Sequence, residues 1–94
     1  MEIVIKRYPN GAVFNGDCLP LLKLVQEETI DLILTDPPYG VNFKNGFFDD
    51  TKESVLGAMP DWFSEWYRIL KDDSYLMLYV GVKTLHHWIS TGIE

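Results

Sequence analysis

The sequence has little cysteine, no long apolar run and few basic residues. Among its 94 residues Cys18 is the only cysteine, which excludes an intramolecular disulfide and a cysteine-cluster metal site. The apolar stretch at the N-terminus is too short for a signal peptide, and no run approaches the length that spans a bilayer. We therefore expect a cytoplasmic protein whose thiol stays reduced and which has no membrane partner.

Positive charge is scarce. The chain has 14 acidic and 8 basic side chains, and its net charge is −6. This is the wrong sign for a protein that binds nucleic acid by itself, because such proteins normally carry a basic stripe. The acidic pairs, among them Asp49–Asp50 and Asp72–Asp73, are spread along the chain and are expected in solvated turns. If the chain contacts DNA, most of the basic surface lies elsewhere.

The chain also lacks a phosphate-binding loop for nucleoside triphosphates. Gly11 and Gly16 have the spacing of the two glycines in such a loop. However, Asp17 and Cys18 stand where the loop needs lysine and then serine or threonine. Nucleoside triphosphate binding is therefore excluded.

The length suits one small domain, and a hydrophobic content of 47% excludes a disordered segment. Periodicity and turn residues predict seven elements in chain order. They are two short strands, a helix, a strand, a long helical segment, a strand and the start of a last helix: residues 1–8, 12–14, 19–27, 30–35, 54–71, 75–80 and 84–90. A turn is expected over 72–74.

The long helical segment carries an apolar face. Its apolar residues recur at steps of three and four and are expected in the core: Val55, Met59, Trp62, Phe63, Trp66 and Leu70. Asp61 and Glu65 fall off this face and are expected in solvent. Because proline is tolerated only in the first turn of a helix, we expect a break at Pro60 and a main helix over 60–70.

The last helix is expected to turn Leu85, Trp88 and Ile89 inward. His86 and His87 are neighbours, so they cannot chelate a metal as an i,i+4 pair. We expect no metal site.

The strand over 30–35 is apolar on both faces apart from Asp31, which is typical of a central parallel strand. We therefore expect Leu32 and Leu34 to be buried, and likewise the strand over 75–80. A strand, a helix and a strand of this kind form a right-handed βαβ unit. The predicted fold class is α/β and Rossmann-like.

A stiff loop, Asp36-Pro37-Pro38-Tyr39-Gly40, follows the strand over 30–35. Two consecutive prolines fix φ and donate no backbone hydrogen bond, and Pro37 holds Asp36 extended. The loop stands at the carboxyl end of a strand, where open α/β sheets bind ligands. We expect it to face a cleft with Asp36 and Tyr39 at least partly accessible. A carboxylate and a rigid carbonyl can accept two N–H groups of a planar amine, while the tyrosine ring stacks on its heterocycle.

This stretch resembles the amino-methyltransferases, whose motif IV reads Asp/Asn/Ser-Pro-Pro-Tyr/Phe/Trp. The Asp form is most similar to the DNA adenine-N6 enzymes, although cytosine-N4 enzymes share the motif. The resemblance implies direct methyl transfer from S-adenosylmethionine to an adenine flipped out of double-stranded DNA. Asp36 and the Pro37 carbonyl would each accept one amine N–H, Pro38 would keep the loop rigid, and Tyr39 would stack on the base. It also implies a bacterial, archaeal or phage-encoded protein.

For the cofactor, the resemblance points to Gly16-Asp17-Cys18, which related enzymes place near the adenine of S-adenosylmethionine. Two roles are open for Asp17: a residue beside the cofactor, or an N-cap of the helix that follows. The Phe-x-Gly-x-Gly loop that binds the methionine part in this family is absent, since no two glycines are one residue apart. The chain therefore resembles the first part of a permuted, beta-class enzyme. Residues 1–94 are expected to form one partial catalytic domain, completed by a C-terminal segment or a partner chain.

Residues 41–50 mix aromatic, polar and glycine residues without a period. We expect Phe47 and Phe48 to pack onto the sheet, while for Phe43 and Lys44 contact with bases, cofactor or phosphate stays open.

Two other functions of the chain also stay open. One is a methyltransferase acting on RNA or protein glutamine, where Asn-Pro-Pro-Tyr is usual and which Asp36 argues against. The other is a non-catalytic remnant or binding module of the same fold.

Overall fold

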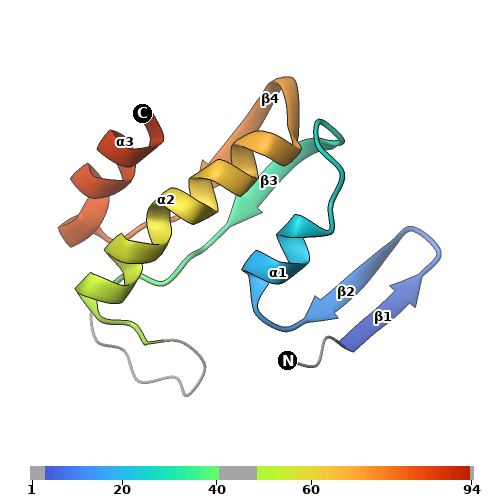
Figure 1. Ribbon diagram of the computed structural model, residues 1–94, viewed down its shortest axis with the longest axis horizontal. Coiled ribbons are helices and arrows are strands. Elements are labelled where there is room, and N and C mark those ends of the chain that lie inside the picture. The colour runs from blue at the N-terminus through green and yellow to red at the C-terminus, as the bar shows by residue number, and fades with distance from the viewer. Residues whose placement is uncertain (1–3, 41–48, 94) are drawn as a thin grey trace.

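The computed structural model describes residues 4–40 and 49–93 (Figure 1). The chain begins with an antiparallel hairpin of β1 (Val4–Tyr8) and β2 (Gly11–Asn15), which confirms the two N-terminal strands. The first helix, α1 (Cys18–Lys23), ends earlier than predicted. Its last turn is tightened, because the N–H groups of Leu24 and Val25 reach back only three residues. The chain then turns through Glu28, whose φ is +53°.

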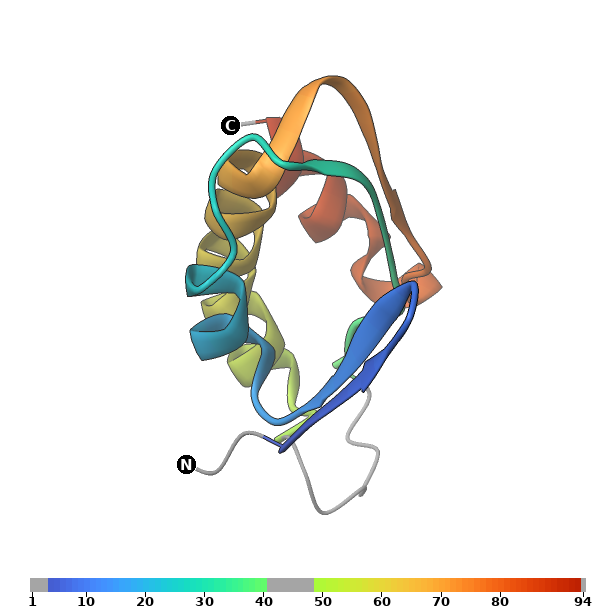
Figure 2. The same cartoon turned by 90° about the vertical axis from the view of Figure 1, so that its right-hand side faces the viewer.

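The centre of the structure is a strand, a helix and a strand. β3 (Ile30–Thr35) pairs in parallel with β4 (Leu70–Leu78), and α2 (Lys52–Ile69) connects them. This confirms the predicted α/β class with parallel strands. Figure 2 shows α1 and α2 on the same side of the β3–β4 pair, with the hairpin as a separate two-stranded sheet.

The expected break at Pro60 is wrong, since α2 runs without interruption from Lys52 to Ile69. A proline inside a helix removes one backbone hydrogen bond and costs about 3 kcal/mol. Apolar side chains on both sides of Pro60 bury against the same cluster: Val55 and Met59 before it, and Trp62 and Trp66 after it. Keeping all four buried requires one continuous helix, and their burial outweighs the lost bond. Pro60 itself is exposed.

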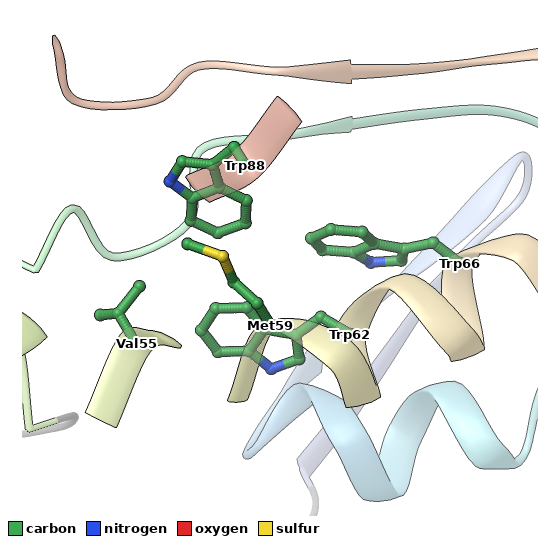
Figure 3. Close-up of a cluster of buried hydrophobic side chains, with 5 residues drawn as sticks. All are labelled: Val55, Met59, Trp62, Trp66 and Trp88. Carbon is green, nitrogen blue, oxygen red and sulfur yellow. The ribbon is translucent and has the colours of Figure 1, made fainter. Parts of the chain in front are cut away.

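The core cluster lies where α2 meets the last helix, as Figure 3 shows. It contains the four buried α2 residues and Trp88, and all five are at most 5% exposed. The rings of Trp62 and Trp88 stack with centroids 6.1 Å apart and planes 7° apart. Ile33 of β3 and Leu76 and Leu78 of β4 pack against the cluster. The prediction that both tryptophans of α2 belong to the core is confirmed.

Arg68 links α2 to the end of α1, and its ion pair with Glu65 of the same helix corrects the expectation that Glu65 is solvated. The Arg68 guanidinium lies 2.6 Å from the Glu65 carboxylate, whose side chain is 14% exposed. Arg68 also donates to the carbonyl oxygens of Leu22 and Val25 at 2.8 and 2.9 Å. These carbonyls lie at the end of α1 and just after it, so one side chain satisfies backbone groups there and fixes the position of this helix end on α2. Asp61, by contrast, is exposed as predicted.

The turn predicted over residues 72–74 lies inside β4. The pairing of Ile30 with Leu70 is followed by that of Leu32 with Tyr75, so β4 carries extra residues at this point. Asp73 adopts a φ of +61°, which places the bend at this irregularity. The strand therefore starts directly at the end of α2 rather than after a separate turn.

The prediction that Leu32 and Leu34 are buried is wrong. They are 51% and 61% exposed, and so are Tyr75 (73%) and Met77 (55%) of β4 and Tyr79 (65%) directly after it. Side chains alternate between the two faces of a strand, and α1 and α2 cover only one face. We call these five residues the open sheet face. Their apolar character is that of a face meant to be covered, because parallel sheets are normally buried on both sides.

The chain ends in a short 3₁₀ turn, η1 (Val82–Thr84), and α3 (Leu85–Ile93). Trp88 is 3% exposed, as expected for an inward residue. Leu85 and Ile89 are 44% and 54% exposed, so the prediction that they point inward is wrong. Trp88 makes the buried contact of α3 with α2, whereas Leu85 and Ile89 stay largely exposed to solvent.

The open sheet face should make the isolated chain self-associate, because apolar patches of this kind seek cover. Replacing Leu34 and Met77, which are paired across β3 and β4, by threonine should lower association and leave the fold intact. Threonine keeps the strand propensity and removes apolar area. Sedimentation velocity measures the effect. Val13→Thr is the matched control, since Val13 is 59% exposed on the hairpin. A wild-type chain that stays monomeric at high concentration would contradict the prediction.

Candidate active site

The loop of residues Asp36–Gly40, called the acceptor loop below, leaves the carboxyl end of β3. β4 ends beside it, and the N–H of Tyr79 still donates to the Thr35 carbonyl at 3.1 Å. The chain segments that follow the two parallel strands are therefore adjacent. Parallel strands end at the same edge of a sheet, which is the usual place of a ligand site in α/β proteins.

The loop presents a carboxylate and an aromatic ring to solvent. Asp36 is exposed, Tyr39 is 36% exposed, Pro38 is half-buried and Pro37 is buried. The prediction that Asp36 and Tyr39 are accessible is confirmed. The buried Pro37 ring anchors the loop, and the two residues expected to meet a ligand stay on the surface.

The structure brings Asp36 and Tyr39 together. The Asp36 carboxylate accepts a hydrogen bond from the Tyr39 hydroxyl, and this bond is the main cause that raises the pKa of Tyr39 above its ordinary value of 10.0. Partial desolvation and the charge of Asp36 act in the same direction. The Asp36 carboxylate, which is expected to accept an amine N–H, therefore accepts the Tyr39 hydroxyl in this structure.

Gly81, in the segment after β4, packs against Tyr39. A Cβ built on Gly81 would stand 3.3 Å from Cβ and 3.4 Å from Cγ of Tyr39, which is tighter than ordinary contact. A larger residue would push against the base of the Tyr39 side chain. The sequence does not indicate this contact of Gly81, because Tyr39 lies far away in the chain.

The loop also has buried polar partners that sequence reasoning missed. The Gly40 N–H donates to the Asp50 carboxylate at 2.7 Å, and the Thr84 hydroxyl lies 3.3 Å from the Tyr39 carbonyl. Asp50 is 5% exposed and Thr84 2%. The expectation that Asp49–Asp50 lies in a solvated turn is therefore wrong for Asp50. Nothing in the sequence indicated this partner, and α2 begins at Lys52, closer to Asp50 than the predicted start at residue 54.

Asp17 caps α1. Its side chain accepts a hydrogen bond from the Leu19 N–H at 3.2 Å, in the geometry of an N-cap. The N-cap role is confirmed, and the role beside a cofactor stays a prediction. The two are compatible, because Asp17 is exposed.

Several expectations concern other surfaces. Phe43, Lys44, Phe47 and Phe48 lie outside the described residues. A groove lined in part by Phe63, Tyr67, Leu76 and Thr91 lies between α2, β4 and α3, and none of its lining residues belongs to the acceptor loop. The cleft expected at the loop stays a prediction.

Within residues 4–40 and 49–93, no cluster of three or more His, Cys, Asp or Glu side chains has the arrangement of a metal site. The rings of His86 and His87 lie 3.9 Å apart between centroids. Among the same residues, no helix is both long and apolar enough to cross a membrane.

Comparison with known proteins decides the family. The profile described as DNA methylase, which covers N6 and N4 methylation, matches residues 30–94. The chain belongs to the N6/N4 DNA methylase family. The match includes the acceptor loop, all of α2 and β4, and the segment that packs on Tyr39, so the resemblance of the Asp-Pro-Pro-Tyr motif to this family is confirmed.

Individual relatives agree with this assignment. The type II methyltransferase M.BamHI of Bacillus amyloliquefaciens is 37% identical over 75 residues, which is 73% of this chain and 17% of the relative. The DNA adenine methyltransferase YhdJ of Escherichia coli is 38% identical over 73 residues, or 69% of this chain and 24% of the relative. M.HpaI of Haemophilus parainfluenzae is 33% identical over 74 residues, or 77% and 24%. The chain thus spans less than a quarter of the length of these relatives.

The contact between Asp36 and Tyr39 predicts an alkaline titration. Because the folded-state pKa of Tyr39 is raised, the hydrogen bond stabilises the fold below the ordinary tyrosine pKa of 10.0 and is lost as pH rises through the raised value. Asp36→Ala should bring the pKa of Tyr39 back towards 10.0. Absorbance of tyrosinate, with Tyr39→Phe subtracted to isolate this residue, measures the shift. An unchanged Tyr39 titration in Asp36→Ala would contradict the contact.

Proposed function

We propose that this chain is the acceptor-binding part of an S-adenosylmethionine-dependent DNA methyltransferase that methylates the exocyclic N6 of adenine. The observation that carries the proposal is the Asp36-Pro37-Pro38-Tyr39 loop at the carboxyl end of β3 in a member of the N6/N4 DNA methylase family. A relative named as an adenine methyltransferase favours adenine. Methylation of cytosine N4 is the alternative, since the family includes it and the loop would accept either amine.

The proposed fold is a part of the Rossmann-like methyltransferase fold. It is supported by the parallel β3–β4 pair, with α1 and α2 on one face and the loop at the carboxyl edge. Residues 1–94 would then form one partial catalytic domain. The open sheet face is where helices of a larger domain would pack. The expected cytoplasmic location follows from the DNA substrate and stays a prediction.

In the proposed mechanism the loop activates a weak nucleophile. The exocyclic amine of adenine is a poor nucleophile because its lone pair is delocalised into the ring. Asp36 and the Pro37 carbonyl would each accept one N–H and favour a pyramidal nitrogen with a localised lone pair. Tyr39 would stack on the base after it has left the duplex. Pro38, with φ fixed by its ring, would keep these groups in place, so that little freedom is lost on reaching the reactive geometry.

The base would replace the contact that the loop makes without ligand. An incoming N–H takes over the Asp36 oxygen that now accepts the Tyr39 hydroxyl. One hydrogen bond to a carboxylate is exchanged for another, so the carboxylate does not lose its donor. The freed Tyr39 side chain can then stack its ring on the base.

The chain fits S-adenosylmethionine only in part. When bound, this cofactor supplies an electrophilic methyl group on sulfur. The exposed Asp17 carboxylate at the start of α1 would contact it from this chain, since that helix end and the carboxyl end of β3 point towards the same end of the molecule (Figures 1 and 2). No two glycines of the chain are one residue apart, so a Phe-x-Gly-x-Gly loop would have to come from a further segment or a partner chain.

In an active enzyme that carries this segment, Asp36→Ala should remove most methyl transfer and leave cofactor affinity nearly unchanged. Loss of a charged acceptor in the transition state costs about 2–4 kcal/mol, which is roughly 30- to 1000-fold in rate. Incorporation of labelled methyl groups into duplex DNA measures it. Asp31→Ala is the matched control, because Asp31 is an exposed aspartate of β3 whose ion-pair partner Lys71 is also exposed. A retained rate in Asp36→Ala would contradict the role of Asp36 as an acceptor of the amine N–H.

The isolated 94 residues should bind S-adenosylmethionine weakly or not at all and should not methylate DNA. Methyl transfer needs the donor in line with the amine at attack distance, and this chain offers Asp17 alone towards the cofactor. Calorimetry with S-adenosylmethionine and a methylation assay measure both properties. Low-micromolar binding by the monomer, together with methylation of duplex DNA, would show that the chain is sufficient without a glycine loop.

A further inference from the structure

A single peptide unit of the acceptor loop is held from two sides. It is the peptide that joins Tyr39 to Gly40, and both of its polar groups have buried partners. Its N–H donates to the Asp50 carboxylate at 2.7 Å, and its carbonyl lies 3.3 Å from the Thr84 hydroxyl. The first distance is short for a bond from a backbone amide and marks a charge-assisted contact. The second is long, so Asp50 is the stronger of the two partners.

The partner on the first side is built into the start of α2. Asp50 directly precedes Thr51, the N-cap, whose hydroxyl accepts from the Ser54 N–H at 3.2 Å. One helical turn on, Val55 is fully buried in the core. The backbone that carries Asp50 is therefore anchored. Gly40 fits closely against it, since its φ is +74° and an added Cβ would stand 3.3 Å from the Lys52 Cα.

The partner on the second side is anchored by α3. The Trp88 indole N–H donates to the Thr84 hydroxyl oxygen at 3.3 Å, and Trp88 is part of the core cluster. Because that oxygen receives the indole hydrogen, the hydroxyl hydrogen remains for a carbonyl. Two carbonyls are in reach, Tyr39 at 3.3 Å and Gly81 at 3.5 Å. The shorter contact is the one to the loop.

We propose that Asp50 is a positioning residue of the acceptor loop, with Thr84 as its weaker counterpart. By holding the Tyr39–Gly40 peptide, Asp50 fixes the backbone torsion that directs the Tyr39 side chain towards Asp36. This inference rests on the proposed function for its catalytic consequence, but the geometric restraint stands without it. A preorganised loop loses little conformational freedom when the base binds. Displacement of the groups that hold the base by about 1 Å can lower a rate about 100-fold.

Two substitutions of Asp50 separate positioning from a general effect on stability. Asp50→Asn keeps an oxygen that can accept from the Gly40 N–H, whereas Asp50→Ala removes it. In the labelled chain, hydrogen exchange of the Gly40 amide reports the bond, and the Tyr39 titration reports the contact with Asp36. Asp50→Ala should speed the hydrogen exchange of the Gly40 amide and bring the pKa of Tyr39 closer to its ordinary value. Asp50→Asn should behave like the wild type in both measurements. A folded Asp50→Ala with both readings unchanged overturns the proposal.

Thr84 supplies a second pair of variants if Asp50→Ala fails to fold. Thr84→Val removes the hydroxyl with little change of shape, and Thr84→Ser keeps it. Thr84→Val should shift the Tyr39 titration in the same direction, by less than Asp50→Ala would, and Thr84→Ser should not. Equal Tyr39 titrations in the two folded Thr84 variants would overturn the proposal.

The catalytic consequence is tested separately. In an active enzyme that carries this segment, Asp50→Ala should lower kcat about 10- to 100-fold and change the KM for S-adenosylmethionine little, because the proposed role of this peptide is to place the groups that hold the base. If the exchange and titration results hold while Asp36→Ala keeps full activity, the proposed function fails and the restraint remains. If kcat is unchanged in Asp50→Ala although the loop has moved, the positioning role fails.

Discussion

The burial of one face of α2 is the interaction on which the rest of the structure depends. Val55, Met59, Trp62 and Trp66 bury on this face against Trp88 and the inner sides of β3 and β4. Truncation of a single buried tryptophan to alanine typically costs about 3–5 kcal/mol, a large share of the roughly 5–15 kcal/mol that stabilises a small domain. The same burial explains why the helix continues through Pro60.

The core and the candidate site share structural elements. Ile33 of β3 and Leu78 of β4 pack on the α2 face, which fixes where both strands end and hence where the loop after β3 meets the segment after β4. Trp88 takes part in both, since its ring stacks in the core while its N–H donates to Thr84 beside the loop. Loosening this core would therefore disturb the site as well as lower stability.

The two faces of the β3–β4 pair differ sharply. The inner face is covered by α2, while the open sheet face exposes five large apolar residues. The net charge of −6 is likewise unfavourable for binding DNA. Both features agree with the proposal that this segment supplies the acceptor loop and that other protein surface supplies the contacts to cofactor and DNA.

Local features of the sequence determined the strands, the stiff loop and the helix caps. The apolar run over 30–35 predicts a strand, and two prolines keep the loop extended, whatever packs around them. The N-cap role of Asp17 was likewise one of two predicted from neighbours a few residues away. Tertiary structure alone decided the partner of Asp50, because Gly40 is ten residues away and the contact forms only when α2 packs on the sheet. It also decided that Leu32 and Leu34 are exposed, since an apolar strand has two faces and its sequence does not show which one the helices cover.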